Sequence, residues 1–145
     1  MKVTLKEINK SNFRDCFALK VSEDQQKWVG SNENSLAMSK FYPSMKTLGI
    51  FDYDTMVGFI MYDIDDESHV YYINRFMIDY KHQKNGYGTQ ALKILTKEIK
   101  DKGEPFLEIL CKADNFPAQN LYKNLGFEFT GEIFNDDQVL KLTLI

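Results

Sequence analysis

The sequence is poor in the residues that build covalently linked or metal-held scaffolds. Its 145 residues include two cysteines, Cys16 and Cys111, and two histidines, His69 and His82. The cysteines form no CxxC pair, so we expect no disulfide framework and two free thiols in a reducing cytoplasm. Two histidines cannot by themselves supply a zinc site, and no carboxylates stand at ligand spacing, so no metal is expected.

Long hydrophobic runs are also missing. No apolar stretch approaches the roughly 18 residues of a membrane span, and the alternating segment Met1–Glu7 lacks the apolar core of a signal peptide. Hydrophobic residues make up 43% and charged residues 27%, which are globular proportions. Neither repeats nor Pro/Gly-rich linkers interrupt the chain. We therefore expect one cytoplasmic domain spanning residues 1–145, with no membrane partner.

Little net charge is present, but it is unevenly distributed. The total of -3 argues against a nucleic-acid partner. Val21 to Asp79 carries ten acidic and four basic residues, a net of -6, whereas Tyr80 to Leu125 carries eight basic and five acidic residues, a net of +3. This division suits a protein that holds a cation on one side and an anion on the other, or simply two solvated surfaces.

Hydrophobic periodicity predicts an α/β (α+β) fold with a mainly antiparallel sheet. Strands are expected at Val3–Ile8, Lys46–Tyr53, Met56–Tyr62, Val70–Ile78, Phe106–Cys111, Phe127–Ile133 and Gln138–Leu144. Helices are expected from Asn9 or Ser11 to Val21, and at Glu33–Phe41, Thr89–Lys100 and Phe116–Leu125. The strand–helix–strand unit from Val70 to Cys111 implies two parallel strands inside this sheet.

A glycine-containing loop, Gln83–Gly88, separates the strongest predicted strand from the longest predicted helix. Glycine lets a backbone approach a ligand closely, and free N–H groups at a helix start favour a phosphate. Lys81, His82 and Lys84 add positive charge. The loop lacks the third glycine of GxGxxG and the Lys-Ser/Thr pair of a P-loop, which disfavours NAD and ATP. The alternative is a plain strand-to-helix turn.

A second motif, Asn115–Phe127, follows a predicted strand. Asn115 stands just past the carboxyl end of that strand, where ligands bind in open sheets. Tyr122 falls at helical spacing with Ala118 and Leu125, which is compatible with simple packing. A tyrosine in such a cleft is also an available general acid for a leaving group.

Together the two motifs resemble the GCN5-related N-acetyltransferase (GNAT) family. The signature Q-x-x-G-x-G is present as Gln83, Gly86 and Gly88. The signature N-x-x-A-x-x-x-Y-x-x-x-G-F is present as Asn115, Ala118, Tyr122, Gly126 and Phe127. The resemblance implies a single-domain mixed sheet of about seven strands, splayed at its central parallel pair and flanked by about four helices. Acetyl-CoA is expected in that opening.

The resemblance also implies roles for individual residues. The backbone of Phe76, Met77 and Ile78 would pair with the pantetheine arm, and Asn115 would contact the cofactor. Tyr122 would bind the cofactor and protonate the departing CoA thiolate. Acetyl transfer would be a direct attack by the amine, with Cys111 a buried core residue. The pyrophosphate would rest on the loop formed by Gln83, Lys84, Asn85, Gly86, Tyr87 and Gly88.

The acceptor is suggested by a narrower resemblance. The segments Leu19–Val29, Val57–Tyr62 and Val70–Asp79 are similar to the spermidine/spermine (diamine) N-acetyltransferase subgroup, which implies a polyamine acceptor. Some polyamine acetylators carry an acidic pair where this chain has Asn74-Arg75. Residues expected to contact the acceptor are Glu23, Asp24, Trp28, Glu33 and Asn74.

Several alternatives remain open at this point. The acceptor could be another small amine such as an aminoglycoside, an amino acid or a ribosomal N-terminus, or the chain could be a non-catalytic module that binds acyl-CoA. Asp63, Asp65, Asp66 and Glu67 are expected at a solvated hairpin tip rather than at a site. The C-terminal strand Val139–Ile145 could pair across a homodimer or close its own sheet.

Overall fold

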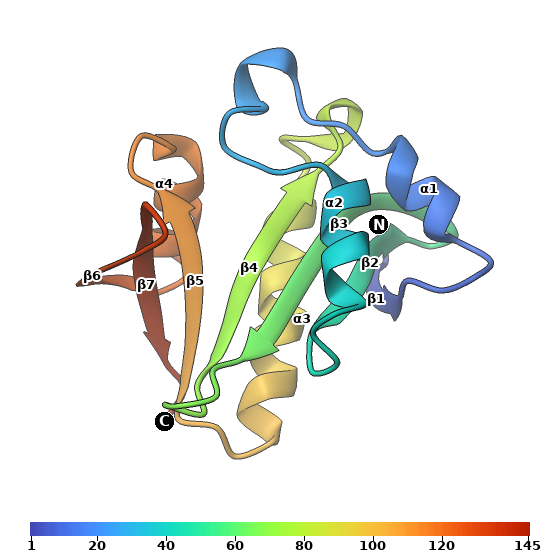
Figure 1. Ribbon diagram of the computed structural model, residues 1–145. Coiled ribbons are helices and arrows are strands. Elements are labelled where there is room, and N and C mark those ends of the chain that lie inside the picture. The colour runs from blue at the N-terminus through green and yellow to red at the C-terminus, as the bar shows by residue number, and fades with distance from the viewer.

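A seven-stranded mixed sheet organises the chain in the computed structural model, which describes residues 1–145 (Figure 1). The fold class and the order of elements predicted from the sequence are confirmed. The strands are β1 (Val3–Glu7), β2 (Lys46–Asp52), β3 (Thr55–Ile64), β4 (Tyr71–Ile78), β5 (Phe106–Lys112), β6 (Glu128–Phe134) and β7 (Asp137–Thr143). The helices are α1 (Phe13–Ala18), α2 (Asn32–Ser39), α3 (Tyr87–Asp101) and α4 (Phe116–Asn124), with short 3-10 turns η1 (Glu23–Gln25) and η2 (Tyr80–His82).

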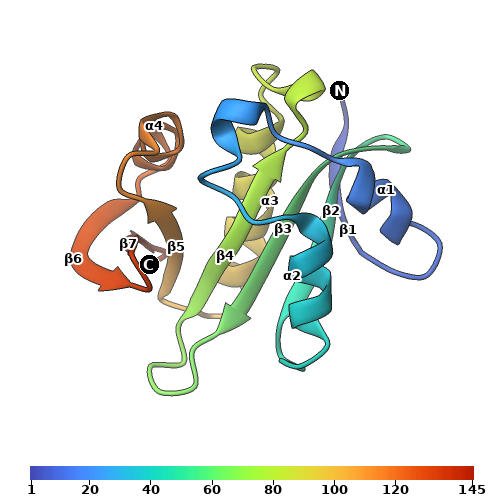
Figure 2. The same ribbon diagram turned by 45° about the horizontal axis from the view of Figure 1, so that its top comes forward.

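The two central strands of the sheet separate from one another. The strand order is β1-β2-β3-β4-β5-β7-β6, and all neighbours are antiparallel except β4 and β5. β4 and β5 pair only from Tyr71 to Ile73 and then diverge, as Figures 1 and 2 show. Beyond Ile73, β4 has no strand partner on the β5 side, so the splayed parallel pair is confirmed.

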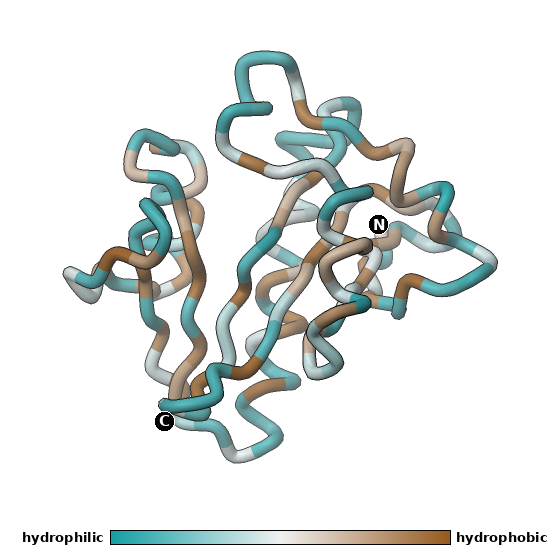
Figure 3. Tube along the Cα trace, in the orientation of Figure 1, coloured by the Kyte–Doolittle hydropathy of each residue, from teal (hydrophilic) through white to brown (hydrophobic).

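Each face of the sheet buries its own hydrophobic cluster. Helix α3 covers one face with Ala91, Leu92, Leu95 and Ile99, all fully buried. Their spacing of three and four residues is that of a one-sided amphipathic helix. Helices α1 and α2 cover the opposite face above a second cluster that includes Phe59. In Figure 3 the hydrophobic colours follow the strands and the facing helices, whereas the loop around η1 is largely hydrophilic.

A β-bulge in β4 changes which side chains share a face. Met61 pairs with Arg75 and Tyr62 pairs with Ile73, so Asn74 has no partner on β3. One extra residue reverses the alternation of every side chain that follows it. Ile73 and Phe76, three residues apart, therefore both pack on the α3 side. Arg75 pairs with Met61, which packs with Met77 on the opposite side.

The first helix is shorter than predicted and begins at a different residue. It starts at Phe13 rather than directly after Asn9 or Ser11, because the Asn9 carboxamide oxygen accepts the Ser11 N–H at 2.9 Å and forms a local turn. It ends at Ala18, where the next residue is extended (φ -69°, ψ 133°). The predicted continuation to Val21 is therefore wrong.

The hairpin after β3 also differs from the prediction. Strand β3 continues to Ile64, and Asp63 is buried rather than part of a solvated tip. The Ser44 hydroxyl donates a hydrogen bond of 2.6 Å to the Asp63 carboxylate. This partner compensates part of the cost of removing the carboxylate from water.

The C-terminal strand closes its own sheet. β7 pairs with β5 on one side and with β6 on the other. Both of its edges are therefore occupied, and of the two alternatives for Val139–Ile145 the structure shows the intramolecular one.

Candidate active site

The turn that leaves β4 is anchored by a buried carboxylate. Asp79 is 6% exposed and accepts the backbone N–H groups of Lys20 at 3.0 Å and Lys81 at 2.9 Å. Two left-handed residues follow, Lys84 (φ 66°) and Gly86 (φ 85°), and they turn the chain into helix α3. The loop is therefore held at its base and shaped by glycine near its end.

The backbone N–H groups of this loop are unused. None from Lys84 to Thr89 donates a hydrogen bond within the protein, and Gly86 precedes α3 without a side-chain cap. A Cβ atom built on Gly86 meets nothing within 4 Å, so the space beside it is open. Free N–H groups at the positive end of a helix dipole suit a phosphate group.

A cavity of about 550 Å³ and another of about 530 Å³ flank the splayed strands. We call the smaller one the glycine-loop cavity. It is lined by ten of the residues predicted to bind the cofactor: Phe76, Met77, Ile78, Gln83, Lys84, Gly86, Tyr87, Gly88, Asn115 and Tyr122. Asn85 lies outside its lining, and its side chain instead donates to the His82 carbonyl at 3.1 Å.

Two predicted cofactor residues hold the loop in place through their side chains. The Gln83 amide donates to the Ile78 carbonyl at 2.9 Å and exchanges hydrogen bonds with Gln25 at 2.9 and 3.1 Å. The Tyr87 hydroxyl donates to the Asp52 carboxylate at 2.6 Å, which raises the pKa of Tyr87 and lowers that of Asp52. These contacts tie the loop to η1 and to the end of β2.

Tyr122 lies where the two cavities meet. It is 4% exposed, and its ring packs between Phe76 and Phe127 with centroids 6.2 and 6.0 Å away. It lines both cavities, and no side-chain hydrogen bond contributes to the shift of its pKa. Burial raises the pKa of the Tyr122 phenol, and Cys111 raises it further, so the phenol carries its proton at neutral pH.

The residues beside Tyr122 are held by the start of α4. The Asn115 side chain accepts the Ala118 N–H at 3.3 Å and caps the helix, which leaves its amide nitrogen unused. Cys111 is buried, as predicted, and burial together with nearby Asp137 and Asp114 raises the pKa of its thiol to about 12. A thiol in this state is a poor nucleophile.

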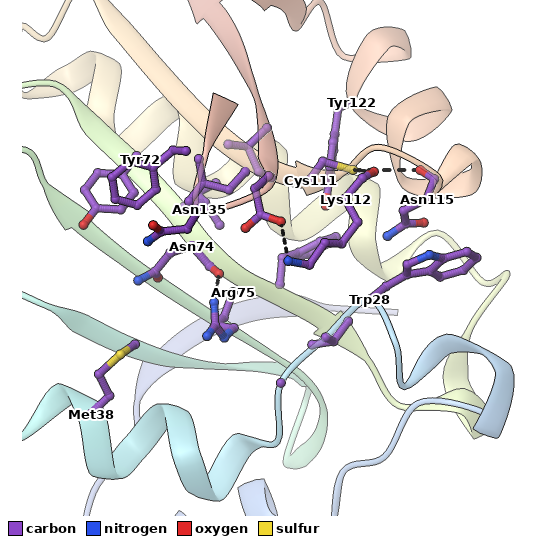
Figure 4. Close-up of a pocket in the computed structure, with 18 of the residues that line it drawn as sticks. Trp28, Met38, Tyr72, Asn74, Arg75, Cys111, Lys112, Asn115, Tyr122 and Asn135 are labelled. Atoms are coloured by element: carbon purple, nitrogen blue, oxygen red, sulfur yellow. Dashed lines mark hydrogen bonds and ion pairs between the residues drawn. The ribbon is translucent and has the colours of Figure 1, made fainter. Parts of the chain in front are cut away.

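The larger cavity, which we call the Arg75 cavity, lies on the other side of Tyr122. Figure 4 shows Trp28, Asn74, Arg75 and Lys112 around it, from the segment before α2, from β4 and from β5. Trp28 and Asn74 were predicted to contact an acceptor, and both line it.

Three other predicted acceptor residues are placed elsewhere. Glu23, Asp24 and Glu33 do not line the Arg75 cavity. Glu33 points to a surface pair with Lys20, 3.8 Å away, and the Asp24 carboxylate accepts the Ser22 hydroxyl at 2.7 Å. The acidic surplus of this part of the sequence is therefore not concentrated at the cavity.

Sequence reasoning missed the cations of this site. Lys27, Arg75 and Lys112 line the Arg75 cavity, and Asp137 is its single carboxylate. The available signal was an arginine inside a mainly apolar strand, in a chain with only one other arginine, Arg14. Its direction depends on the bulge at Asn74, which the sequence pattern does not reveal.

No cluster of three or more histidine, cysteine, aspartate or glutamate side chains with the spacing of a metal site is present. None of the helices combines the length and the hydropathy required to cross a membrane.

Comparisons with known proteins give a family and several relatives. Residues 3–127 match the Acetyltransferase (GNAT) family. The Bacillus subtilis (strain 168) spermine/spermidine N(1)-acetyltransferase is 29% identical over 150 residues, which cover 97% of each chain. The Thermoplasma acidophilum PaiA N-acetyltransferase, solved with coenzyme A, superposes with a TM-score of 0.73, 17% identity and 99% coverage of each chain. The Vibrio cholerae spermidine N-acetyltransferase, solved with CoA and spermine, gives a TM-score of 0.77 at 12% identity, covering 98% of this chain and 95% of that one.

Proposed function

The chain belongs to the GNAT acetyltransferase family and is an acyltransferase, and from this premise we propose that it transfers the acetyl group of acetyl-CoA to a primary amine of a small molecule by direct attack. The observation that carries this proposal is the position of Tyr122. Tyr122 lines both the glycine-loop cavity and the Arg75 cavity. A group at this junction reaches a donor molecule on one side and an acceptor on the other.

The residues of the glycine-loop cavity fit acetyl-CoA. The unused N–H groups of Lys84–Thr89 would hold the pyrophosphate, and Lys81 and Lys84 would add positive charge. The free edge of β4 from Phe76 to Ile78 offers backbone donors and acceptors to the pantetheine arm. The Ile78 carbonyl already accepts a hydrogen bond from the Gln83 side chain, which holds the end of the strand in place.

Acetyl-CoA supplies an acetyl group activated as a thioester. Direct attack then needs an amine in its unprotonated form, a polarised carbonyl and a proton for the sulfur, and the nitrogen releases one proton to solvent as the amide forms and the C–S bond breaks. Unpaired N–H groups of β4 would provide the polarisation, and the protonated Tyr122 phenol would provide the proton. No nucleophilic side chain is required, in agreement with the raised pKa of Cys111.

Two acceptor classes have support. A polyamine is supported by the names of the Bacillus subtilis and Vibrio cholerae proteins and by the acidic surplus of Val21–Asp79. An amine with an anionic group is supported by the cations that line the Arg75 cavity. Both classes share the primary amine that the proposed reaction consumes.

The purified protein is expected to bind CoA saturably, and EDTA is expected to leave that affinity unchanged. The reason is that the glycine-loop cavity offers backbone N–H groups and Lys84 rather than a cluster of metal-ligating side chains. Isothermal titration calorimetry measures the binding, and release of free CoA thiol during incubation with a panel of amines measures turnover. Binding that EDTA abolishes, or the absence of acetylated amine across the panel, would contradict the proposal.

Replacement of Cys111 with alanine is expected to leave kcat within about threefold of the unmodified enzyme, because the thiol is not a nucleophile at neutral pH. Removing a buried sulfur should lower stability by about 1 kcal/mol. Cys16→Ala is the matched control, since Cys16 is also buried with a thiol pKa raised to about 12 but lies outside both cavities. An acetylated Cys111, detected by mass spectrometry after incubation with acetyl-CoA, would overturn direct attack.

A further inference from the structure

The Arg75 guanidinium has no counter-ion. Its Nη1 donates to the Asn74 carbonyl at 2.7 Å, but its Nε is buried and without a partner. Arg75 takes part in none of the four ion pairs of the protein. Cβ of an alanine at Gly30 would lie 3.4 Å from this Nε, so the segment before α2 packs closely against the guanidinium.

The other charges of the cavity do not neutralise Arg75. Asp137 is the single carboxylate among the lining residues, and it already pairs with Lys112 at 2.9 Å. The Lys27 ammonium lies 5.0 Å from the centre of the Trp28 ring. Arg75 and Lys27 both line the cavity, and neither takes part in an ion pair. Figure 4 shows Arg75 at this place.

The bulge leaves a complementary pair of unused polar atoms. Asn74 Oδ1 is buried without a donor, and the adjacent Arg75 Nε is buried without an acceptor. Unpaired buried polar atoms are costly, and a cation is the costliest of them. Because neither atom is accessible, a ligand in the cavity would meet the guanidinium through Nη2, which makes no hydrogen bond and is not among the buried atoms.

We propose that the acceptor is a small primary amine that also carries an anionic oxygen group, a carboxylate or a phosphate, and that Arg75 binds this group. A guanidinium presents a planar fork of donors that suits both kinds of oxyanion. The inference rests on the proposed function, because it assigns the acceptor class of the same site.

Matched pairs of amines test the proposal. Lysine and cadaverine differ by a carboxylate, and O-phosphoethanolamine and ethanolamine differ by a phosphate. We expect the anionic member of at least one pair to have the higher kcat/KM, and the pair that responds identifies the anion. Arg75→Gln is expected to lower kcat/KM for that member by about 10- to 100-fold, the usual effect of losing a hydrogen bond to a charged group. The same substitution should leave kcat/KM for the amine without the anion within about threefold of the value for the unmodified enzyme.

Two further variants separate recognition from folding. Arg14→Gln removes the other arginine of the chain, which is exposed on α1, and should behave as the unmodified enzyme does. Arg75→Glu should give the amine without the anion the higher kcat/KM in the responding pair. A purely structural role of Arg75 would not reverse this order. Arg75 does not line the glycine-loop cavity, so CoA affinity should persist in all three variants and report intact folding.

The outcomes distinguish this inference from the function on which it rests. Acetylation of spermine or cadaverine in preference to every anionic amine, with kcat/KM insensitive to Arg75→Gln, would overturn the anion site and leave the N-acetyltransferase proposal standing. If Arg75→Gln lowered kcat/KM equally for both members of a pair, Arg75 would have a structural role and would not bind the anion. If no amine is acetylated although CoA binds, the proposed function fails and the acceptor assignment fails with it.

Discussion

Replacing Tyr122 with phenylalanine is expected to lower kcat by about 10²- to 10⁴-fold, the usual contribution of a general acid. The ring contacts with Phe76 and Phe127 remain, and only the hydroxyl at the junction of the two cavities is lost. CoA affinity should be nearly unchanged, because the proton is needed only as charge develops on the sulfur. Single-turnover kinetics measures the chemical step separately from product release, which could otherwise hide the effect.

Tyr62→Phe is the matched control for this experiment. Tyr62 is also a buried tyrosine with a raised pKa, caused chiefly by burial, but it lies in the hydrophobic cluster beneath α3 and lines neither cavity. Its variant should keep the single-turnover rate. If Tyr122→Phe also stays within about threefold of the unmodified enzyme, a difference of only about 0.65 kcal/mol, Tyr122 is a packing residue and the general acid is another group.

Gly86→Val is expected to weaken CoA binding at least about tenfold, because a left-handed conformation costs an L-residue roughly 1–2 kcal/mol and a β-branched one more. Gly86 has φ 85°, its N–H donates no hydrogen bond within the protein, and the residue lines the glycine-loop cavity. A valine there either changes the backbone or places its side chain in the open space beside the loop. Calorimetry with CoA measures the loss.

Gly103→Val provides the control for backbone strain. Gly103 has φ 86°, and a Cβ there also meets nothing within 4 Å, but it follows the opposite end of α3. Thermal unfolding should show a similar decrease in Tm for both variants, whereas only Gly86→Val should have a lower affinity for CoA. Equal affinities in the two variants would show that the loop does not hold the cofactor.

The helices and strands of this fold are determined mainly by local sequence patterns. The short apolar run in Lys46–Asp52 and the helical spacing in Tyr87–Asp101 depend on neighbours a few residues apart, so the pattern alone predicts them. The glycine loop was predicted for the same reason, since the left-handed turn at Gly86 is a property of the residue itself. The motif with Asn115 and Tyr122 then identified the family.

Charge along the sequence was a poorer guide, because proximity in the chain is not proximity in space. Glu23, Asp24 and Glu33 share a net acidic segment with Asn74, yet only Asn74 lines the Arg75 cavity. Surface carboxylates are free to turn toward solvent or toward a nearby lysine, as Glu33 does. Composition therefore suggested a cationic ligand, whereas the folded cavity presents mainly cations.

The sequence by itself determined which residues form strands and helices, and it identified the loop and the tyrosine that support the proposed reaction. Only the tertiary structure decided where β4 and β5 part, and that Tyr122 lies between two cavities. It also decided the direction of Arg75, because the bulge at Asn74 arises from the register between β3 and β4. Register depends on long-range pairing, and a shift of one residue moves a side chain to the other face of the sheet.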